Sequence, residues 1–474
     1  MGCSFSSIRR PSGLLAKLSR LTADMLSFSD QPEAFLPTLA EFVAIPSVSR
    51  DASEEVMLRA ATWLRDRLDF AGARVETTAG HPVVRADWMS DSDAPTILVY
   101  GHYDVQPTGD LAEWRTSPFD MVIDGEVVRG RGVTDDKGPV FIVTEVARAF
   151  FEQEGFPPLN IKFLFEGEEE IGSPHLAEYV QSHADDLACD LVISADGAMW
   201  RASEPSLSLM SKGLVSLSIE ASGANRDLHS GRFGGTVANP LHGLAELLNT
   251  LHSPSGLVNV PGFYDGVTPL SEERRRELAS VEFSEQEYRE DLGVEELYGE
   301  DGLSTLERLW ERPTLEINGV EGGGKYTVIP HLARAHLSAR LVPGQDPARV
   351  IEAIVTCVGD FTFPGLAFTV TVDPGSVAAY TIPVDHPAIR AAHSALSQVY
   401  PDQTTLMTCI AGTLPATTLF ESVLGAKTLF FSFSTADEYL HAPNEFMRIR
   451  RFGEGLRAWE ILWRSLADGP HRLT

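Results

Sequence analysis

Histidines and carboxylates recur in this sequence at the points where apolar stretches of strand length end. Thr96–Tyr100 leads directly into His102 and Asp104. Ile161–Phe165 leads into the acidic segment Glu166–Glu170. In open parallel sheets, ligands bind beyond the carboxyl ends of the strands. These residue types at these places therefore indicate a site that handles protons or binds a cation.

Three further segments carry the same residue types toward this edge. Leu191–Ser194 is followed by Asp196, and Thr428–Phe433 is followed by a loop that contains His441. The segment Gly130–Gly138 precedes an expected helix, and it lacks the spacing of a phosphate-binding loop. Massed carboxylates raise one another's pKa, and a divalent cation removes that cost. Two imidazoles with several carboxylates fit zinc or a neighbouring first-row metal, and the surplus of carboxylates predicts two ions that share a bridge.

The elements that must position these residues follow from the hydrophobic pattern. Apolar strands alternate with helical stretches such as Pro32–Ser47, Pro139–Phe151 and Pro387–Val399. This alternation predicts an α/β fold with a mostly parallel sheet flanked by helices. The pattern changes after about residue 211, where Leu214–Ala221 alternates like a half-exposed strand and Ser271–Arg312 is typical of a solvated helical excursion.

We therefore expect a catalytic domain in two pieces around an inserted α+β lid or dimerisation domain. The predicted boundaries are 1–31 for an N-terminal extension expected to lack order, 32–211 and 385–474 for the catalytic domain, and 212–384 for the inserted domain.

Composition narrows the classes of partner. Lys and Arg total 38 against 67 Asp and Glu, a formal net charge of −29. Such a surface repels phosphate backbones and anionic lipids, so we expect no nucleic-acid and no membrane partner. Four widely spaced cysteines without a C-x-x-C pair favour reduced thiols and a cytoplasmic location.

The N-terminal residues allow other interpretations. The first six residues fit an acylation pattern, and the basic, Ser-rich stretch to Thr22 resembles an organelle transit peptide. Both patterns arise easily by chance, and Met25 is an alternative start. We favour a chain without a targeting segment.

Four motifs together resemble the dinuclear-zinc exopeptidase and deacylase family, which includes aminoacylase, acetylornithine deacetylase and carnosinase-like dipeptidases. They are Gly101–Pro107, Gly130–Gly138, Glu166–Ser173 and Leu440–Glu445. Three others, Arg226–Gly231, Lys325–Pro330 and Ser338–Pro343, resemble the cytosolic non-specific dipeptidase branch. The similarity begins near Pro32. The residues around Asp196 and before His441 differ from those of the eukaryotic dipeptidases. The resemblance therefore leaves open which substrate side chains are preferred.

The resemblance implies a site with two Zn²⁺ per subunit, with Mn²⁺ or Co²⁺ as alternatives. The implied ligands are a bridging Asp135, His102 and Asp196 at one ion, and Glu170 and His441 at the other.

The same resemblance assigns roles beyond the ligands. Glu169 acts as general base, Asp104 orients the His102 imidazole, and the Asp135–Asp136 peptide is cis.

Substrate contacts are implied in the inserted domain and near residue 411. His229 is expected to reach the partner's site across a homodimer formed by the inserted domain, and to stabilise the oxyanion. Arg340 is expected to bind the substrate's terminal carboxylate. The remaining expected lining residues are Thr327, Ala411, Gly412 and Thr413.

The predicted function is hydrolysis of dipeptides or short peptides with a free terminal carboxylate by a zinc-dependent metallo-exopeptidase. An N-acyl amino acid deacylase on the same machinery is the first alternative. A catalytically inactive binding scaffold is the second, although it would have lost Glu169 or a metal ligand, and all are present.

Overall fold

The computed structural model describes residues 31–90, 93–410 and 412–469. The chain divides into two compact units. The first consists of Met1–Leu207, Pro383–Leu406 and Leu419–Thr474, and the second of Ser208–Ile382 and Met407–Thr418. The second unit is thus inserted in the first, and the short segment 407–418 also belongs to it. The predictions about the first 30 residues and Ala411 lie outside the described residues.

The first unit is built on a six-stranded sheet in the order β1-β2-β6-β3-β7-β17. β3 pairs in parallel with β6 and β7, β7 pairs in parallel with β17, and β1 and β2 form an antiparallel edge. The predicted mostly parallel sheet is therefore confirmed. The strands are β1 (Arg74–Glu76), β2 (Val83–Trp88), β3 (Thr96–His102), β6 (Asn160–Glu166), β7 (Leu191–Ser194) and β17 (Lys427–Phe430).

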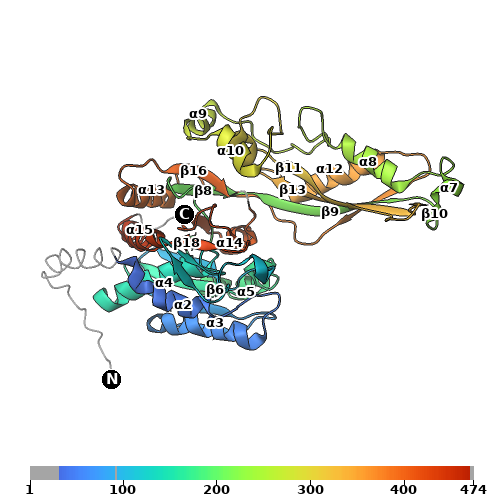
Figure 1. Cartoon of the computed structure of the whole chain (residues 1–474). Coiled ribbons are helices and arrows are strands. Elements are labelled where there is room, and N and C mark those ends of the chain that lie inside the picture. Colours follow the sequence, from blue (N-terminus) through green and yellow to red (C-terminus); the bar gives the residue numbers. More distant parts are fainter. Residues whose placement is uncertain (1–30, 91–92, 411, 470–474) are drawn as a thin grey trace, which may run out of the picture. The chain divides into compact units, whose positions relative to one another are not determined.

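Helices lie against this sheet (Figure 1). β3, β6 and β7 are buried almost throughout, as expected for parallel strands covered on both faces. The helices of the first unit are α2 (Leu36–Val43), α3 (Glu54–Arg67), α4 (Lys137–Glu154), α5 (Leu176–Ser182), α6 (Ala184–Leu187), α13 (Pro387–Val399), α14 (Pro415–Leu424) and α15 (Ile449–Ala467). Of these, α14 begins in the second unit and ends in the first. A small sheet of β4 (Val122–Asp124), β5 (Val127–Arg129) and β18 (Phe446–Arg448) accompanies them.

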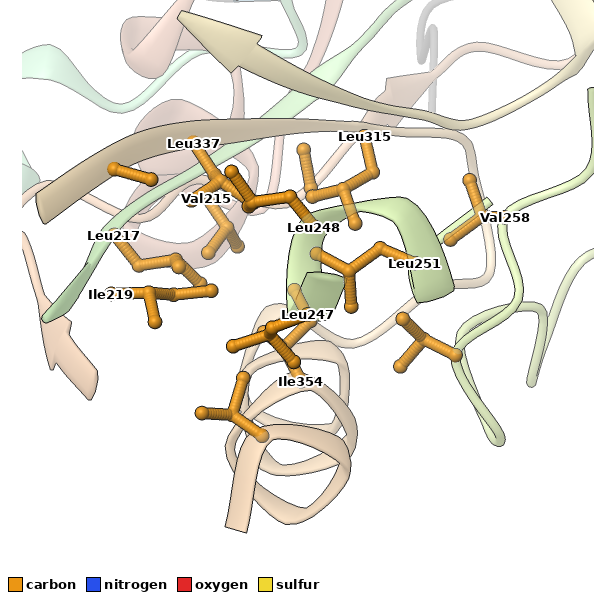
Figure 2. Packing of buried hydrophobic residues seen from close by; sticks show 14 of the residues in the cluster. Val215, Leu217, Ile219, Leu247, Leu248, Leu251, Val258, Leu315, Leu337 and Ile354 are labelled. Carbon is orange, nitrogen blue, oxygen red and sulfur yellow. The ribbon is translucent and has the colours of Figure 1, made fainter. Parts of the chain in front are cut away.

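The second unit contains an antiparallel sheet in the order β11-β13-β9-β14. Along β9, buried and half-buried residues alternate strictly, because one face of the sheet packs on α8 and α12. Leu247, Leu248 and Leu251 of the α8 segment and Ile354 of α12 meet the sheet in this core (Figure 2). The elements are β9 (Gly213–Ser222), β11 (Thr314–Glu321), β13 (Leu332–Leu341), β14 (Ala367–Val372), α8 (Pro240–Thr250) and α12 (Pro347–Asp360).

Smaller elements complete the second unit. The segment Ser271–Arg312 forms three helices, each with a serine cap: α9 (Glu272–Ser280), α10 (Glu285–Leu292) and α11 (Thr305–Glu311). β8 (Ser206–Ser211) lies between β15 (Tyr380–Thr381) and β16 (Leu406–Ile410), and β10 (Leu228–His229) pairs with β12 (Val328–Ile329) next to α7 (Ser230–Phe233).

Two predicted elements are wrong in extent. The single helix over Pro32–Ser47 is a 3₁₀ turn, Pro32–Phe35, followed by α2, which ends at Val43. Proline removes a helical hydrogen-bond donor and restricts the residue before it, so Pro37 is confined to the first turn of α2 and Pro46 disfavours continuation. The strand predicted to reach Phe433 ends at Phe430, which pairs with the last residue of β7. Within the described ranges, no helix is long and apolar enough to cross a membrane.

Candidate metal centre

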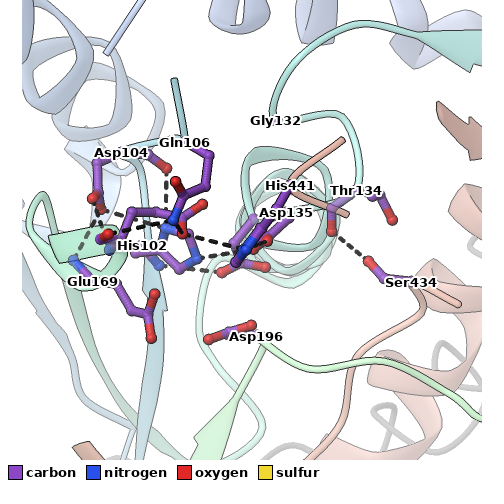
Figure 3. A network of polar contacts seen from close by, with 12 residues as sticks. His102, Asp104, Gln106, Gly132, Thr134, Asp135, Glu169, Asp196, Ser434 and His441 are labelled. Atoms are coloured by element: carbon purple, nitrogen blue, oxygen red, sulfur yellow. Dashed lines mark hydrogen bonds and ion pairs between the residues drawn. The ribbon is translucent and has the colours of Figure 1, made fainter. Parts of the chain in front are cut away.

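Three parallel strands of the first unit end beside one another at the candidate site. β3 ends at His102, and β6 ends shortly before the 3₁₀ turn Glu169–Ile171. β7 ends two residues before Asp196. Figure 3 shows the side chains of His102, Glu169 and Asp196 close together. The carboxyl edge of the sheet therefore gathers these residues, as the sequence predicted.

Asp135 occupies the centre of this cluster. Its Oδ1 lies 3.2 Å from Nε2 of His102, and its Oδ2 lies 2.9 Å from Nε2 of His441. Nε2 of His441 also lies 3.3 Å from Oε2 of Glu170. One carboxylate thus faces two imidazoles with a different oxygen each, which is the arrangement a ligand between two cations requires (Figure 3).

The donor atoms fall into two overlapping groups. In each group the potential ligand atoms lie within 4.8 Å of one another: His102 with Asp135 and Glu170, and His102 with Glu169 and Asp196. In the first group Glu170 lies near His102, whereas the resemblance assigns Glu170 and His441 to one ion and His102 to the other. The second group includes Glu169, to which the resemblance assigns the role of base. Imidazole and carboxylate donors at this spacing fit a first-row divalent metal.

The orientation of His102 also suits a ligand. Its Nδ1 donates to the backbone carbonyl of Asp104 at 3.0 Å and lies 3.4 Å from the Asp104 carboxylate. Because Nδ1 carries the proton of that hydrogen bond, Nε2, which faces Asp135, is the ring nitrogen that would lose its proton to bind a cation. A hydrogen bond to the second ring nitrogen is the usual way to fix a metal-binding histidine.

The carboxylates of the cluster are costly to ionise without a cation. Burial, followed by repulsion from Asp135, raises the pKa of Glu170 to about 8. Burial raises the pKa of Asp196 to about 6 and that of Glu169 well above its ordinary value. Burial also opposes ionisation of Asp135, yet hydrogen bonds from His102 and His441 hold its pKa below the usual range. A divalent ion would offset the repulsion, so the residues present fit a metal.

Asp104 has a second task that the sequence did not predict. Its two carboxylate oxygens accept hydrogen bonds from the backbone N–H groups of Glu169, at 3.2 Å, and Glu170, at 3.1 Å. Gln106 adds a hydrogen bond of 2.7 Å from Nε2 to Oε2 of Glu170. The strand motif that supplies His102 therefore also holds the turn that carries Glu169 and Glu170.

Glu445 is a supporting residue to which sequence reasoning gave no role, although it lies in a quoted motif. Its carboxylate is fully buried and accepts hydrogen bonds from the backbone N–H groups of Gly132, Thr134 and Asp135, at 3.0 to 3.2 Å. Nη1 of Arg131 forms an ion pair with Oε2 at 2.7 Å. Glu445 thus fixes the loop that presents Asp135. A lone acid after His441 was the available signal, and only the fold shows what it contacts.

Asp136 is a further buried acid beside the cluster. Its Oδ2 accepts a hydrogen bond from the backbone N–H of His102 at 3.1 Å, and its Oδ1 has no hydrogen-bond partner among the described residues. The peptide bond between Asp135 and Asp136 is cis, which confirms the implied conformation.

The expected substrate residues lie in the second unit, where they form two groups. β10 and β12 pair His229 with Val328, and the Thr327 carbonyl accepts hydrogen bonds from the backbone N–H and hydroxyl of Ser230. His229 is exposed, and its Nδ1 accepts a hydrogen bond from the backbone N–H of Gly231 at 3.1 Å. This leaves the proton of the neutral ring on Nε2, pointed away from its own turn.

Arg340 and Thr413 form the second group. Nη1 of Arg340 donates to Oγ1 of Thr413 at 2.8 Å. Gly412, in the same segment, is exposed. The structure thus brings Arg340 together with the segment expected to line the carboxylate end of the substrate.

Comparison with known proteins agrees with this geometry. Residues 98–465 match the model of peptidase family M20/M25/M40. A Cys-Gly metallodipeptidase of Saccharomyces cerevisiae is 30% identical, over 92% of this chain and 96% of its own. The crystal structure of human carnosine dipeptidase 1 is 28% identical with a TM-score of 0.79 and covers 94% of this chain and 99% of that one. A family M20 metallo-carboxypeptidase from Sulfolobus solfataricus is 30% identical with a TM-score of 0.81 and covers 91% and 99%.

Proposed function

Because the chain belongs to peptidase family M20/M25/M40, we propose that it is a metallodipeptidase that hydrolyses dipeptides with a free terminal carboxylate. The observation that carries the proposal is the position of Asp135 between His102 and His441, with Glu169, Glu170 and Asp196 beside it. Every residue of that group is a histidine, aspartate or glutamate, which are types that can bind a metal ion or transfer a proton.

We propose further that His102, Asp135, Glu170, Asp196 and His441 hold two Zn²⁺ ions, with Asp135 as the bridge. When bound, such ions polarise the scissile carbonyl and lower the pKa of a water molecule. The pairing of Asp135 with both imidazoles, and the cost of leaving these acids buried without a cation, support this assignment.

Glu169 is the proposed general base. Its half-buried carboxylate lies beside His102 and Asp196, and desolvation raises its pKa well above the usual range, which increases its affinity for a proton. The Asp104 carboxylate accepts hydrogen bonds from the backbone N–H groups of Glu169 and Glu170, which fixes the turn that carries the base. Glu169 takes a proton from the attacking water and returns it to the leaving amine.

The proposal extends to assembly and location. We propose a homodimer formed by the inserted unit, in which the outward Nε2–H of His229 donates to the developing oxyanion. We also propose a cytoplasmic location, which the free thiols of Cys189, Cys357 and Cys409 support.

A substrate panel tests the activity. The purified protein, supplied with Zn²⁺ or Mn²⁺ and analysed for metal content, is assayed on dipeptides and on N-acetylated amino acids in parallel. We expect turnover of dipeptides and little turnover of the acetylated set. Turnover of the acetylated set alone would show a deacylase, and no turnover of either with both metals loaded would support the binding scaffold.

A further inference from the structure

The second unit contains a cavity of about 980 Å³ whose charged lining is mainly positive. Four cationic side chains line it against the two carboxylates of Glu300 and Glu316. The cations are Lys212, Arg308, Arg312 and Arg340. This excess stands out in a chain whose formal net charge is −29. A concave site with uncompensated positive charge attracts an anion.

The acids of the cavity do not neutralise Lys212 and Arg340. Glu300 is held by Nε and Nη2 of Arg312, at 2.8 and 2.7 Å. Glu316 is exposed on β11. Among the described residues, neither Lys212 nor Arg340 has a carboxylate oxygen within ion-pair distance. These two cations therefore lack an anionic partner within the described chain.

The backbone places Lys212 beside Arg340. Lys212 is the single residue between β8 and β9, and its N–H donates to the carbonyls of Ile410, at 3.2 Å, and Gly412, at 3.1 Å. The same short segment supplies the Thr413 hydroxyl that accepts from Arg340. Both cations are thus anchored to the segment that follows β16.

The charged side chain of Lys212 is buried, which costs free energy. It is 5% exposed, and its Nζ donates one hydrogen bond, of 2.8 Å, to the Arg312 backbone carbonyl, although an ammonium group has three donors. Burial lowers the pKa of Lys212, and the charge of Arg340 acts in the same direction, whereas Cys409 and Glu311, the latter paired with Arg274, act against it. Buried charges are ordinarily paired, so an unpaired one facing a cavity indicates a ligand.

We propose that Lys212 shares with Arg340 the binding of the substrate's C-terminal carboxylate, a role that the family resemblance gives to Arg340 alone; this inference rests on the proposed function. Arg340 supplies the planar fork and Lys212 a point charge, and both retain N–H donors to which none of the described residues accepts. Lys212 is then a specificity-determining residue that selects peptides with a free carboxyl terminus.

The test compares Lys212→Gln with Lys212→Arg. Glutamine retains an N–H donor for the Arg312 carbonyl but removes the charge, whereas arginine retains the charge. Each variant is assayed on Ala-Ala and on its C-terminal amide. Arg334→Gln is the matched control, because Arg334 lies on the same strand and face as Arg340 but is paired with Glu220 at 2.9 Å.

We expect Lys212→Gln to raise the KM for Ala-Ala by about tenfold or more, the loss of one charge-assisted hydrogen bond, and to leave the KM for the amide nearly unchanged. Lys212→Arg should recover most of this discrimination, and Arg334→Gln should retain all of it. Calorimetry with Ala-Ala on Glu169→Ala protein, with and without Lys212→Gln, should show the same loss of affinity without turnover.

An equal rise in KM for Ala-Ala and its amide would overturn the inference and leave Lys212 as a structural contact of the Arg312 carbonyl. A loss confined to peptides with a C-terminal Asp or Glu would also overturn it, because Lys212 would then read a side chain. If the wild-type protein cleaves no dipeptide, the proposed function fails instead. Calorimetry would then still decide whether Lys212 binds a carboxylate.

Discussion

The two compact units treat charged side chains in opposite ways. In the first unit Asp104, Asp135 and Glu445 are buried at or beside the metal centre, and backbone N–H groups fix Asp104 and Glu445 in place. In the second unit Arg334 and Arg340 lie along the polar face of an alternating sheet and are only partly covered, although Lys212 is buried. The first arrangement holds atoms at fixed distances for chemistry, and the second presents adaptable charges for recognition.

This contrast teaches where each part of the function is sensitive to substitution. Changes in the first unit should affect turnover or folding, because buried polar groups leave unsatisfied partners when they are removed. Changes in the second unit should affect substrate affinity and discrimination while the fold survives.

Glu169→Gln should lower kcat by about 10²–10⁴-fold, because the attacking water loses its proton acceptor. Metal content, measured by elemental analysis, should remain that of the wild type. Glu168→Gln is the neighbouring control, since the Glu168 carboxylate contacts His81 and His175 instead of the cluster, and it should retain turnover. Near-normal activity of Glu169→Gln would show that the base is another residue.

Glu445→Gln should lower the free energy of unfolding by about 3–5 kcal/mol, the usual cost of breaking a buried ion pair. The amide places an NH₂ group opposite backbone N–H donors and removes the charge that faces Arg131. Denaturant unfolding measures the effect. Glu152→Gln, on an exposed pair with Arg148 in the same unit, should cost less than about 1 kcal/mol, and equal costs would contradict the structural role given to the buried acids of the first unit.

His229→Ala should lower kcat by about 10²–10³-fold through loss of one oxyanion donor, with metal content and melting temperature unchanged. The side chain is exposed in its own unit, so folding has little dependence on it.

Mixing Glu169→Gln and His229→Ala proteins tests whether the site is shared between subunits. Mixed dimers would contain one site with both Glu169 and His229 intact, so activity should return as subunits exchange. Exchange itself is followed by differently tagged subunits. Confirmed exchange without recovery would place His229 in its own subunit's site or outside catalysis.

Arg340→Lys should raise the KM for dipeptides by about tenfold with little change in kcat, because lysine lacks the planar fork that binds a carboxylate with two parallel hydrogen bonds. Arg334→Lys, on the same face of β13, should change neither constant. A fall in kcat without a change in KM would contradict this role. It would mean that Arg340 stabilises the transition state of the reaction instead of the bound substrate.

Much of the fold was predictable because the signals are local. β3, β6 and β7 were identified from continuous apolar runs, and α4 and α13 from the helical stretches that begin at Pro139 and Pro387. The early helix was predicted too long, because Pro37 and Pro46 restrict the backbone more than the apolar pattern reveals. His102, Glu169 and Asp196 were predicted as neighbours because parallel strands place their carboxyl ends along one edge.

The residues that were not predicted act through contacts distant in the sequence. Glu445 reaches Gly132, 313 positions away, and Lys212 meets a carbonyl 100 positions away. Neither residue type signals such a role, since a glutamate or lysine is ordinarily exposed.

The residue types at the strand ends, and the family that the motifs resemble, could be read from the chain alone, because strand patterns and motifs consist of neighbouring positions. Only the tertiary structure decided which oxygen of Asp135 faces which imidazole, how Asp104 and Glu445 hold their loops, and that Lys212 is buried beside Arg340 without a carboxylate partner among the described residues. These features depend on distances between atoms of separate chain segments, and such distances exist only once the chain has packed.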